Sequence, residues 1–446
     1  MPIIGILRFA NRASLCNRTG VCGRFPEELI FHSCCPRASP SRKYDESGKG
    51  VIVHNCAAVV WLGILLLATG CGGGGDAAPS TATNVQPVTV DPGPANNANL
   101  LFTTVTICAP GSTFNCQSID HVLVDTGSTG LRIMSSLLSP SLSLQQQTDT
   151  NGEPVVACGQ FAVGYAWGPV KVADVKMAGE AAGSVPIQVI GDPAFPVVPA
   201  SCSSVGPPMN SVQALGANGL LGVAVFQQDC GPACAQIAIP GTYYICSSTG
   251  CQPTQASLTQ QLQNPIGMFS RDNNGVIIVL PSVPATGAAS VTGSMIFGIG
   301  TQGNNGLGNA HVIPVDSNTA TFTTFLNPFF YGNSFIDSGS NALFFADPGI
   351  ATCSIAIDFD CPASTLILSG TNQGTSGAAS IVNFPVANAE LLFAANPTFA
   401  AFGNLAGPNS DNTSFDWGLP FFFGRNVFTA FKGQNTPAGP GPYVAY

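Results

Sequence analysis

Short runs of β-branched, aromatic and other apolar residues dominate the chain beyond residue 100, and Gly, Pro or Asn separates them. Such runs, bounded by turn-forming residues, predict β-strands. Few stretches have helical periodicity: the best is 257–262, and Asp347-Pro348 has the residues of a helix start, an N-cap followed by Pro. We therefore expect an all-β fold with strands at 100–107, 119–125, 160–165, 170–177, 185–190, 275–280, 294–299, 311–315, 321–326, 333–337 and 342–346.

The N-terminal pattern differs. Residues 57–69 form an apolar run that is shorter than the roughly 20 residues of a membrane span and has the length of a signal-peptide hydrophobic region. Ala68-Thr69-Gly70-Cys71 follows and resembles the bacterial lipobox, whose Cys is lipidated; the alternative is a cleaved signal with Cys71 incidental. We expect a lipoprotein signal peptide at 51–70, lipid attachment at Cys71, a disordered tether at 71–99 and a location in the bacterial cell envelope. Residues 1–50 fit no signal peptide, and we interpret them as lying upstream of the true translation start.

Charge separates these regions further. Only 8 % of the 446 residues are charged, where an average soluble protein has roughly 25 %. Residues 1–70 hold eight of the 14 basic residues and four of the 23 acidic ones, so the remainder carries a net charge of −13. Without a basic stripe, a nucleic-acid partner is not expected. We expect a monomer that meets the membrane only through the lipid at Cys71.

The cysteines follow the same division. Five of the 16 precede Cys71, and ten follow it. An even number in an exported chain predicts disulfides, although spacing alone does not give their connectivity. A metal site at Cys230-Gly-Pro-Ala-Cys234 is the weaker interpretation, because no His lies nearby. The simplest pairing is Cys108–Cys116, Cys158–Cys202, Cys230–Cys234, Cys246–Cys251 and Cys353–Cys361.

Two carboxylates stand in matching local sequences, His121-Val-Leu-Val-Asp125-Thr126-Gly127-Ser128 and Asn333-Ser-Phe-Ile-Asp337-Ser338-Gly339-Ser340. In each, an apolar strand delivers an Asp to a turn inside the core. The Gly lets the turn approach another segment closely, and the hydroxyls can hydrogen-bond the carboxylate. A single Asp-Thr-Gly turn is usually structural, but two with the same apolar lead-in indicate a paired site.

This pattern resembles the pepsin-like aspartic proteases. Asn218 to Ala224 (NGLLGVA) resembles the apolar-Gly segment beside the family's first Asp, and Phe421 to Phe431 (FFFGRNVFTAF) resembles the one beside the second. Gln160–Gly179 is similar to the flap hairpin and puts Tyr165 at the flap tyrosine. The match spans roughly 100–433. The chain is also similar to a bacterial group of exported proteins with no assigned function.

The resemblance implies a bilobal fold, with a cleft between an N-terminal lobe at 100–280 and a C-terminal lobe at 281–446. It implies that Asp125 and Asp337 are catalytic. The residues it assigns to supporting roles are Thr126, Gly127, Ser128, Ser338, Gly339, Ser340, the flap residue Tyr165 and the glycines Gly222 and Gly424.

Three departures from the family stand out. Arg132 replaces a usual Trp, and either lowers the pKa of Asp125 or points to solvent. Trp167 is a residue of the core or of the cleft. The Cys-rich segment 229–254 is an insertion relative to the family.

The expected activity is that of an aspartic endopeptidase, in which the Asp125/Asp337 pair activates a water molecule for peptide hydrolysis. No cofactor or metal is needed, and the isolated His121 and His311 disfavour a zinc protease. The competing class is a catalytically silent protein of the same fold that binds a peptide or glycan in the envelope. A structural surface lipoprotein is a third interpretation, but it leaves the paired motifs without a role.

Overall fold

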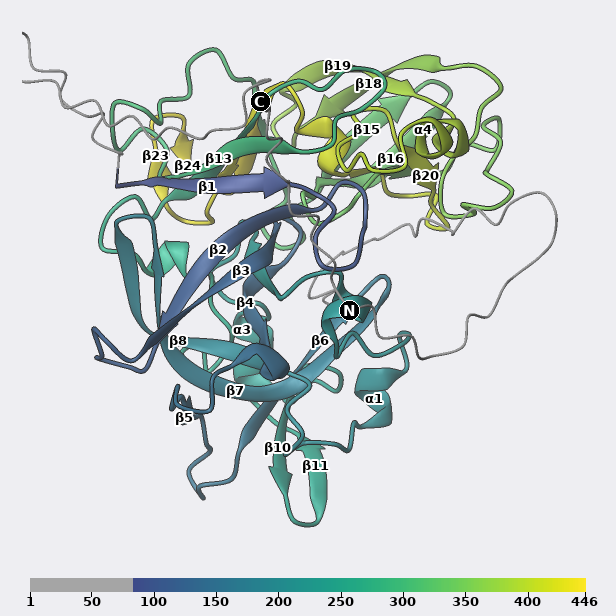
Figure 1. Cartoon of the computed structure of the whole chain (residues 1–446). Coiled ribbons are helices and arrows are strands. Elements are labelled where there is room, and N and C mark those ends of the chain that lie inside the picture. The colour runs from purple at the N-terminus through teal and green to yellow at the C-terminus, as the bar shows by residue number, and fades with distance from the viewer. Residues whose placement is uncertain (1–82) are drawn as a thin grey trace, which may run out of the picture. The chain divides into compact units, whose positions relative to one another are not determined.

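The computed structural model describes residues 83–446, which form β-strands joined by turns and a few short helices (Figure 1). The all-β class expected from the strand pattern is confirmed. The segments 1–50 and 51–70 and the predicted lipid-attachment site Cys71 lie outside the described residues. All of the described residues belong to one compact unit. Between residues 83 and 446 there is no helix with the length and apolar character needed to cross a membrane.

Six strands in the N-terminal half close into a ring, because β7 pairs with β2 as well as with β8. Their inward side chains, such as Val105, Val124 and Leu221, belong to the largest apolar cluster of the described residues. In ring order the strands are β2 (Leu101–Cys108), β3 (Cys116–Asp125), β9 (Gly219–Val223), β4 (Thr129–Met134), β8 (Glu180–Ile190) and β7 (Gly164–Met177).

This ring is part of a 16-stranded sheet that extends into both halves of the chain. From β7 it continues through β6 (Val155–Phe161) to the hairpin of β10 (Tyr243–Ser247) and β11 (Gly250–Pro253), and β5 (Gln145–Gln146) also pairs with β7. From β2 it continues through β1 (Val85–Val90), which Figure 1 shows lying between β2 and β13. The strands beyond β1 are β13 (Val291–Phe297), β12 (Gly275–Leu280), β22 (Arg425–Ala430), β25 (Tyr443–Ala445) and β14 (Val312–Pro314). The expected lobe boundary at 280/281 therefore falls between β12 and β13, which pair with each other.

A second, seven-stranded sheet is built from the C-terminal half alone. Its order is β19 (Ala379–Val386), β18 (Leu366–Gln373), β15 (Phe322–Leu326), β16 (Phe329–Ile336), β21 (Asp416–Trp417), β17 (Leu343–Phe345) and β20 (Ala406–Pro408). The remaining pair is β23 (Asn435–Thr436) with β24 (Gly439–Pro440).

The helices of the described residues are short: α1 (Ala200–Ser203), α2 (Val212–Leu215), α3 (Pro232–Gln236), α4 (Ala389–Ala395) and three 3₁₀ turns at Ser135–Leu137, Ile266–Met268 and Leu419–Phe421. The helix expected at 257–262 is wrong, since this segment makes a turn in which Ser257 O accepts from Gln260 N (2.8 Å). The helix expected to begin at Asp347 is also a turn, closed by Gly349 N donating to Asp347 Oδ1 (2.9 Å). In both places the helical signal is confined to a few residues, and no amphipathic run follows to continue a helix.

Ten of the eleven expected strands coincide with strands of the structure within a few residues. The run 160–165 instead spans the turn between β6 and β7, where Phe161 pairs with Gly164. Several strands were not expected, among them β18 and β19, whose alternation includes small and polar residues such as Ser369, Gly370 and Asn383.

The expectation of a disordered tether at 71–99 is wrong for its described part. β1 pairs with both β13 and β2. Asn99 is fully buried, and its side-chain amide donates to the carbonyls of Asn341 (3.0 Å) and Phe402 (2.9 Å). The Pro- and Asn-rich composition suggested a linker, but these residues join the two halves of the fold.

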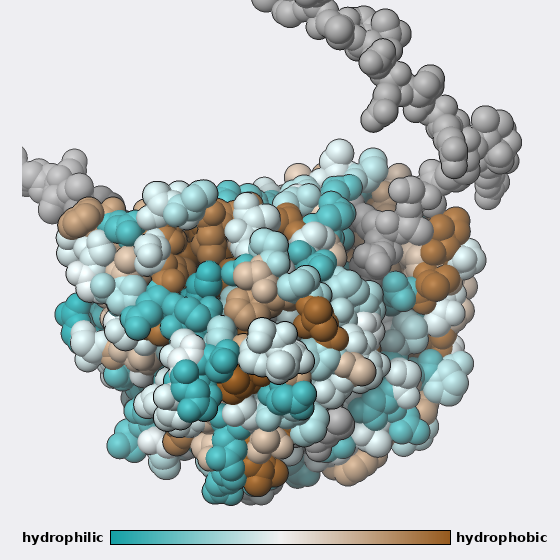
Figure 2. Space-filling view, turned by 90° about the horizontal axis from the view of Figure 1, so that it is seen from below, coloured by the Kyte–Doolittle hydropathy of each residue, from teal (hydrophilic) through white to brown (hydrophobic). Residues whose placement is uncertain are grey.

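The five predicted disulfides are confirmed, with the expected partners: Cys108–Cys116, Cys158–Cys202, Cys230–Cys234, Cys246–Cys251 and Cys353–Cys361. The surface agrees with the low charge of the chain. Figure 2 shows hydrophilic and intermediate residues over most of the face seen from below, with apolar residues in separate patches.

Candidate active site

The two Asp loops of the sequence meet in the structure. The first loop (Asp125–Ser128) follows β3, and the second (Asp337–Ser340) follows β16. The carboxyl groups of Asp125 and Asp337 share a hydrogen bond, although the residues are far apart in the chain. A Cβ added at Gly127 would lie 2.6 Å from Asp337 Cγ, so only glycine allows this approach.

Two hydroxyl residues brace the loops reciprocally. Thr126 Oγ1 donates to the carbonyl of Ile336 (3.1 Å) and accepts from Ser338 N (2.9 Å). Ser338 Oγ donates to the carbonyl of Val124 (2.8 Å) and accepts from Thr126 N (3.1 Å). Each side chain thus binds the strand end and the loop of the other half, which fixes the relative position of the two carboxyl groups.

Within each loop the carboxylate is held in the same way. Gly127 N donates to Asp125 Oδ1 (2.8 Å), and Ser128 Oγ donates to Asp125 Oδ2. Gly339 N donates to Asp337 Oδ1 (2.8 Å), and Ser340 Oγ lies 3.1 Å from Asp337 Oδ2. All eight residues of the two loops that the resemblance assigned to the site therefore come together.

Burial sets the titration of this pair. Both side chains are fully buried. Burial raises the pKa of Asp125, although the bonds from Asp337, Ser128 and Gly127 and the charge of Arg132 act to lower it. Burial also raises the pKa of Asp337 well above its usual range, and the negative charges of Asp125 and Asp416 raise it further. The pair therefore retains a proton at a pH where isolated Asp side chains are ionised.

A glycine stands opposite each Asp in the neighbouring strand. Asp125 pairs with Gly222 in the parallel strand β9. In the second half β16 runs parallel to β21, with Ile336 opposite Trp417, so the residue opposite Asp337 is Gly418. A Cβ at either glycine would lie 2.7 Å from a backbone oxygen of the adjacent loop, that of Ser128 or of Ser340.

Gly222 thus lies beside the first Asp loop, as expected. Gly424 was expected beside the second Asp loop, and this expectation is wrong. Gly424 donates its N–H to the carbonyl of Leu280 and lies against Ser282, directly before β22, an interior strand of the large sheet. It follows the 3₁₀ turn Leu419–Phe421, six residues beyond Gly418. The apolar-Gly pair beside the second Asp loop is therefore Trp417-Gly418, and the three Phe residues at 421–423 precede a different glycine.

Arg132 is buried and paired, so the expectation that it points to solvent is wrong, and its lowering effect on the pKa of Asp125 is outweighed by burial. Its Nη2 lies 3.4 Å from Asp229 Oδ2, with exposed side-chain fractions of 1 % and 2 %. Arg132 Nη1 donates to the carbonyl of Thr129 (2.8 Å), and the guanidinium lies 5.6 Å from the ring centre of Phe161. Asp229 also accepts from Tyr243 Oη (2.6 Å). The Cys-rich segment 229–254 therefore supplies the counter-charge for Arg132, and the effect of Arg132 on Asp125 is the smallest of those acting on that carboxyl.

Tyr165 is a core residue of the β6–β7 hairpin, and among the described residues no hydrogen bond joins it to either carboxyl group of the pair. It is 8 % exposed and belongs to an apolar cluster with Trp167, Tyr244 and the Cys158–Cys202 disulfide. Its N–H donates to the carbonyl of Pro207 (3.1 Å). The β6–β7 hairpin exists as expected, but the period of two places Tyr165 on the face opposite Phe161. Trp167 is confirmed as a core residue, with its indole Nε1 donating to the carbonyl of Phe195 (3.0 Å).

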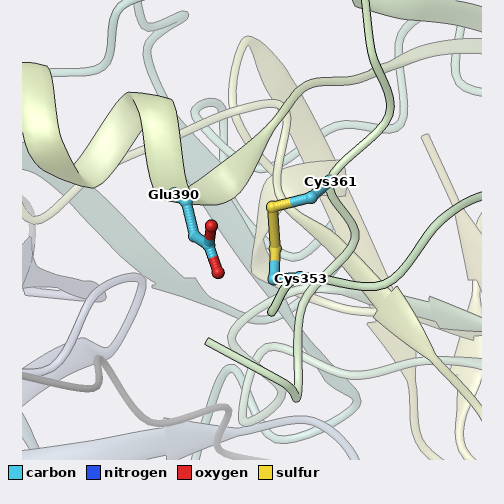
Figure 3. A group of neighbouring side chains, drawn as sticks. All are labelled: Cys353, Cys361 and Glu390. Carbon is cyan, nitrogen blue, oxygen red and sulfur yellow. A yellow bond between two sulfur atoms is a disulfide. The ribbon is translucent and has the colours of Figure 1, made fainter. Parts of the chain in front are cut away.

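One further group has metal-ligand chemistry: Cys353, Cys361 and Glu390, whose ligand atoms lie within 4.8 Å of one another. Figure 3 shows that the two sulfurs are joined in a disulfide beside Glu390. The Glu390 carboxylate accepts from Ile355 N (2.6 Å) and Ala356 N (3.2 Å), bonds that lower its pKa. In this state the group holds the loop 353–361 against α4 and does not present thiolate ligands.

Sequence reasoning missed three residues near the site: Asp229, Asp416 and Gly418. A signal existed for Gly418, because Trp417-Gly418 is an apolar-Gly pair like Leu221-Gly222. The other two depend on strand register and on contacts between distant segments, which have no local signature.

Comparisons with known proteins give a family but no activity. No curated protein matches the chain. A family model described as "Protein of unknown function (DUF3443)" matches residues 80–446, which is most of the chain and contains every described residue of the site. The chain therefore belongs to the DUF3443 family of proteins of unknown function.

Proposed function

We propose that this protein is an aspartic endopeptidase with a bilobal, pepsin-like arrangement, in which the Asp125/Asp337 pair activates water. The observation that carries the proposal is the contact of two carboxyl groups from equivalent loops 212 residues apart, cross-braced by Thr126 and Ser338. A fold maintains two acidic groups in such burial only at a cost, and pairs of this kind are typical of acid–base sites.

The proposed mechanism is general acid–base hydrolysis. Two carboxyl groups in contact share one proton, because ionising both in a buried site is unfavourable. The ionised member takes a proton from a water molecule, which attacks the peptide carbonyl. The protonated member donates a hydrogen bond to the oxygen on which negative charge develops. The chain supplies every group needed for these steps.

The substrate class in this proposal is a peptide or protein segment met outside the cytoplasm. Five disulfides support an oxidising compartment. Attachment to the bacterial envelope through a lipid on Cys71 remains part of the proposal, as does a monomeric state.

A second candidate function has one observation in its favour. Asp125 and Asp337 are both fully buried, and a substrate reaches them only if a segment over the pair moves. A protein of the same fold that binds a peptide or glycan in the envelope without cleaving it needs no such movement.

Cleavage of a diverse peptide library between pH 3 and pH 7, analysed by mass spectrometry, tests the proposal. We expect cleavage that pepstatin inhibits and that Asp125→Asn or Asp337→Asn abolishes. The matched control is Asp120→Asn, an exposed carboxylate on the same strand as Asp125. A folded wild-type protein that cleaves nothing favours the binding function, and cleavage that survives either substitution in the pair refutes the mechanism.

A further inference from the structure

A third buried carboxyl group, Asp416, stands next to the pair. It is fully buried on β21, opposite Phe335 of β16 and Phe344 of β17. Its Oδ2 lies 2.7 Å from Ser340 Oγ, which is also 3.1 Å from Asp337 Oδ2. Ser340 therefore connects Asp416 to one member of the catalytic pair.

The corresponding place in the first half is apolar. There Leu220 of β9 stands opposite Leu123 of β3 and Arg132 of β4, two residues before the glycine that faces the Asp. Asp416 likewise stands two residues before Gly418. The two Asp loops are alike in sequence and in the residues that bond to each carboxyl group. Their surroundings differ, because the position occupied by Leu220 beside the first loop is occupied by Asp416 beside the second.

The Ser340 hydroxyl has only one proton to donate. If it donates to the ionised Asp416, the nearer partner, its oxygen turns a lone pair toward Asp337 Oδ2. That contact is then favourable only when Asp337 Oδ2 carries a proton and donates to Ser340. In the first loop no second acceptor among residues 83–446 competes for the Ser128 hydroxyl, and it donates to Asp125 Oδ2, which favours the ionised form of Asp125.

We propose that Asp416 is a positioning residue that keeps the shared proton on Asp337 and so leaves Asp125 as the base. This inference rests on the proposed function. The chain of donors runs from Asp337 Oδ2 to Ser340 Oγ and from Ser340 Oγ to Asp416 Oδ2. The charged groups that act on it are consistent with this order: Asp416 and Asp125 raise the pKa of Asp337, and the Arg132 guanidinium acts on Asp125. No proton leaves the three-carboxyl group in this arrangement. Asp416 holds the shared proton on Asp337 and thereby raises the pH at which the pair loses it.

The pH dependence of kcat/KM for peptide cleavage tests the inference through Asp416→Asn. An amide at this position donates to Ser340, which then donates to Asp337 and favours its ionised form. We expect the alkaline limb of the profile to move down by at least about one pH unit, which is a tenfold change in the proton affinity of the pair. Ser340→Ala should move it in the same direction, and the double variant should add little. Asp360→Asn, another buried carboxyl of the second half, is the matched control and should leave the limb unchanged.

An alkaline limb that stays within about 0.3 pH units of the wild type in Asp416→Asn, or that moves up, overturns the inference. If that variant does not fold, Asp416→Leu, which copies the first half, takes its place, and Ser340→Ala tests the same link with Asp416 intact. A wild-type protein without activity refutes the proposed function only. In that event the titration of Asp337 by NMR of protein labelled with ¹³C at the Asp carboxyls decides the inference: it stands if Asp337 loses its proton at lower pH in Asp416→Asn, and fails if it does not.

Discussion

The buried pair Arg132–Asp229 makes stability depend on pH in a direction opposite to that of most ion pairs. Burial raises the pKa of Asp229 to about 6 from its usual 3.8, and the Arg132 charge and the Tyr243 hydroxyl offset only part of this rise. Between these two pH values the folded protein binds more protons at this site than the unfolded chain does. The contribution of Asp229 to stability is therefore present below about pH 4 and is lost as the pH rises to about 6.

The magnitude follows from the shift. A rise of about two pKa units corresponds to roughly 3 kcal/mol of unfolding free energy between pH 4 and pH 7. At the Arg132–Asp229 separation of 3.4 Å, the attraction is about 5 kcal/mol at an effective dielectric constant of about 20. Removing that attraction in Arg132→Met should raise the pKa of Asp229 further and extend the loss of stability to higher pH.

Urea unfolding of the wild type and of Asp229→Asn at pH 4 to 7 measures this effect as a difference, which removes the contributions of other groups. Below pH 4 the protonated acid and the amide are alike, so the two proteins should have similar stability. Toward pH 7 the wild type should lose about 3 kcal/mol relative to the variant. Asp316→Asn is the control, because backbone N–H donors lower the pKa of Asp316 below its usual 3.8, so its difference curve should be nearly flat between pH 5 and pH 7. A difference curve for Asp229 that is flat, or that rises with pH, refutes the reasoning.

Three further predictions concern backbone approach and covalent links. Gly418→Ala places a Cβ 2.1 Å from the carbonyl oxygen of Ala342 and should lower the unfolding free energy by about 3 kcal/mol. Gly424→Ala should lower it by about 1 kcal/mol, because Gly424 has a positive φ. Equal losses in urea unfolding contradict the assignment of Gly418 to the site. Gly127→Ala displaces Asp337 and should lower kcat/KM by about 100-fold with a smaller effect on unfolding, and retained activity speaks against the contact. Removing Cys158–Cys202, whose partners are 44 residues apart, should cost about 4 kcal/mol of unfolding free energy, and a loss below about 1 kcal/mol contradicts the loop-entropy estimate.

Much of the strand content was predictable because its cause is local. Each buried strand needs its own apolar run, and each turn needs its own Gly, Pro or Asn. The two Asp loops were found for the same reason, since the strand, the carboxylate, the glycine and the hydroxyl that hold each site are contiguous. Four of the five disulfides join cysteines within eight residues of each other, so proximity in sequence was a sufficient guide.

The remaining features are products of long-range register. β1 lies in a Pro- and Asn-rich segment, and its pairing with β13 and β2 makes it a strand. Gly418 and Asp416 reach the second loop because β21 runs parallel to β16, a relation that no local pattern states. The counter-charge of Arg132 is Asp229, 97 residues away in the Cys-rich segment 229–254.

The sequence by itself therefore indicated the all-β class, the four short-range cysteine pairs and the two loops that carry Asp125 and Asp337, because the physical causes of each lie within a few consecutive residues. Only the tertiary structure showed that these loops meet, which glycines allow their close approach, and that a third carboxyl group, Asp416, lies beside the Asp337 loop but not beside the Asp125 loop. Those relations depend on which strand lies beside which and in what register, and burial turns them into the electrostatic differences on which the proposed chemistry depends.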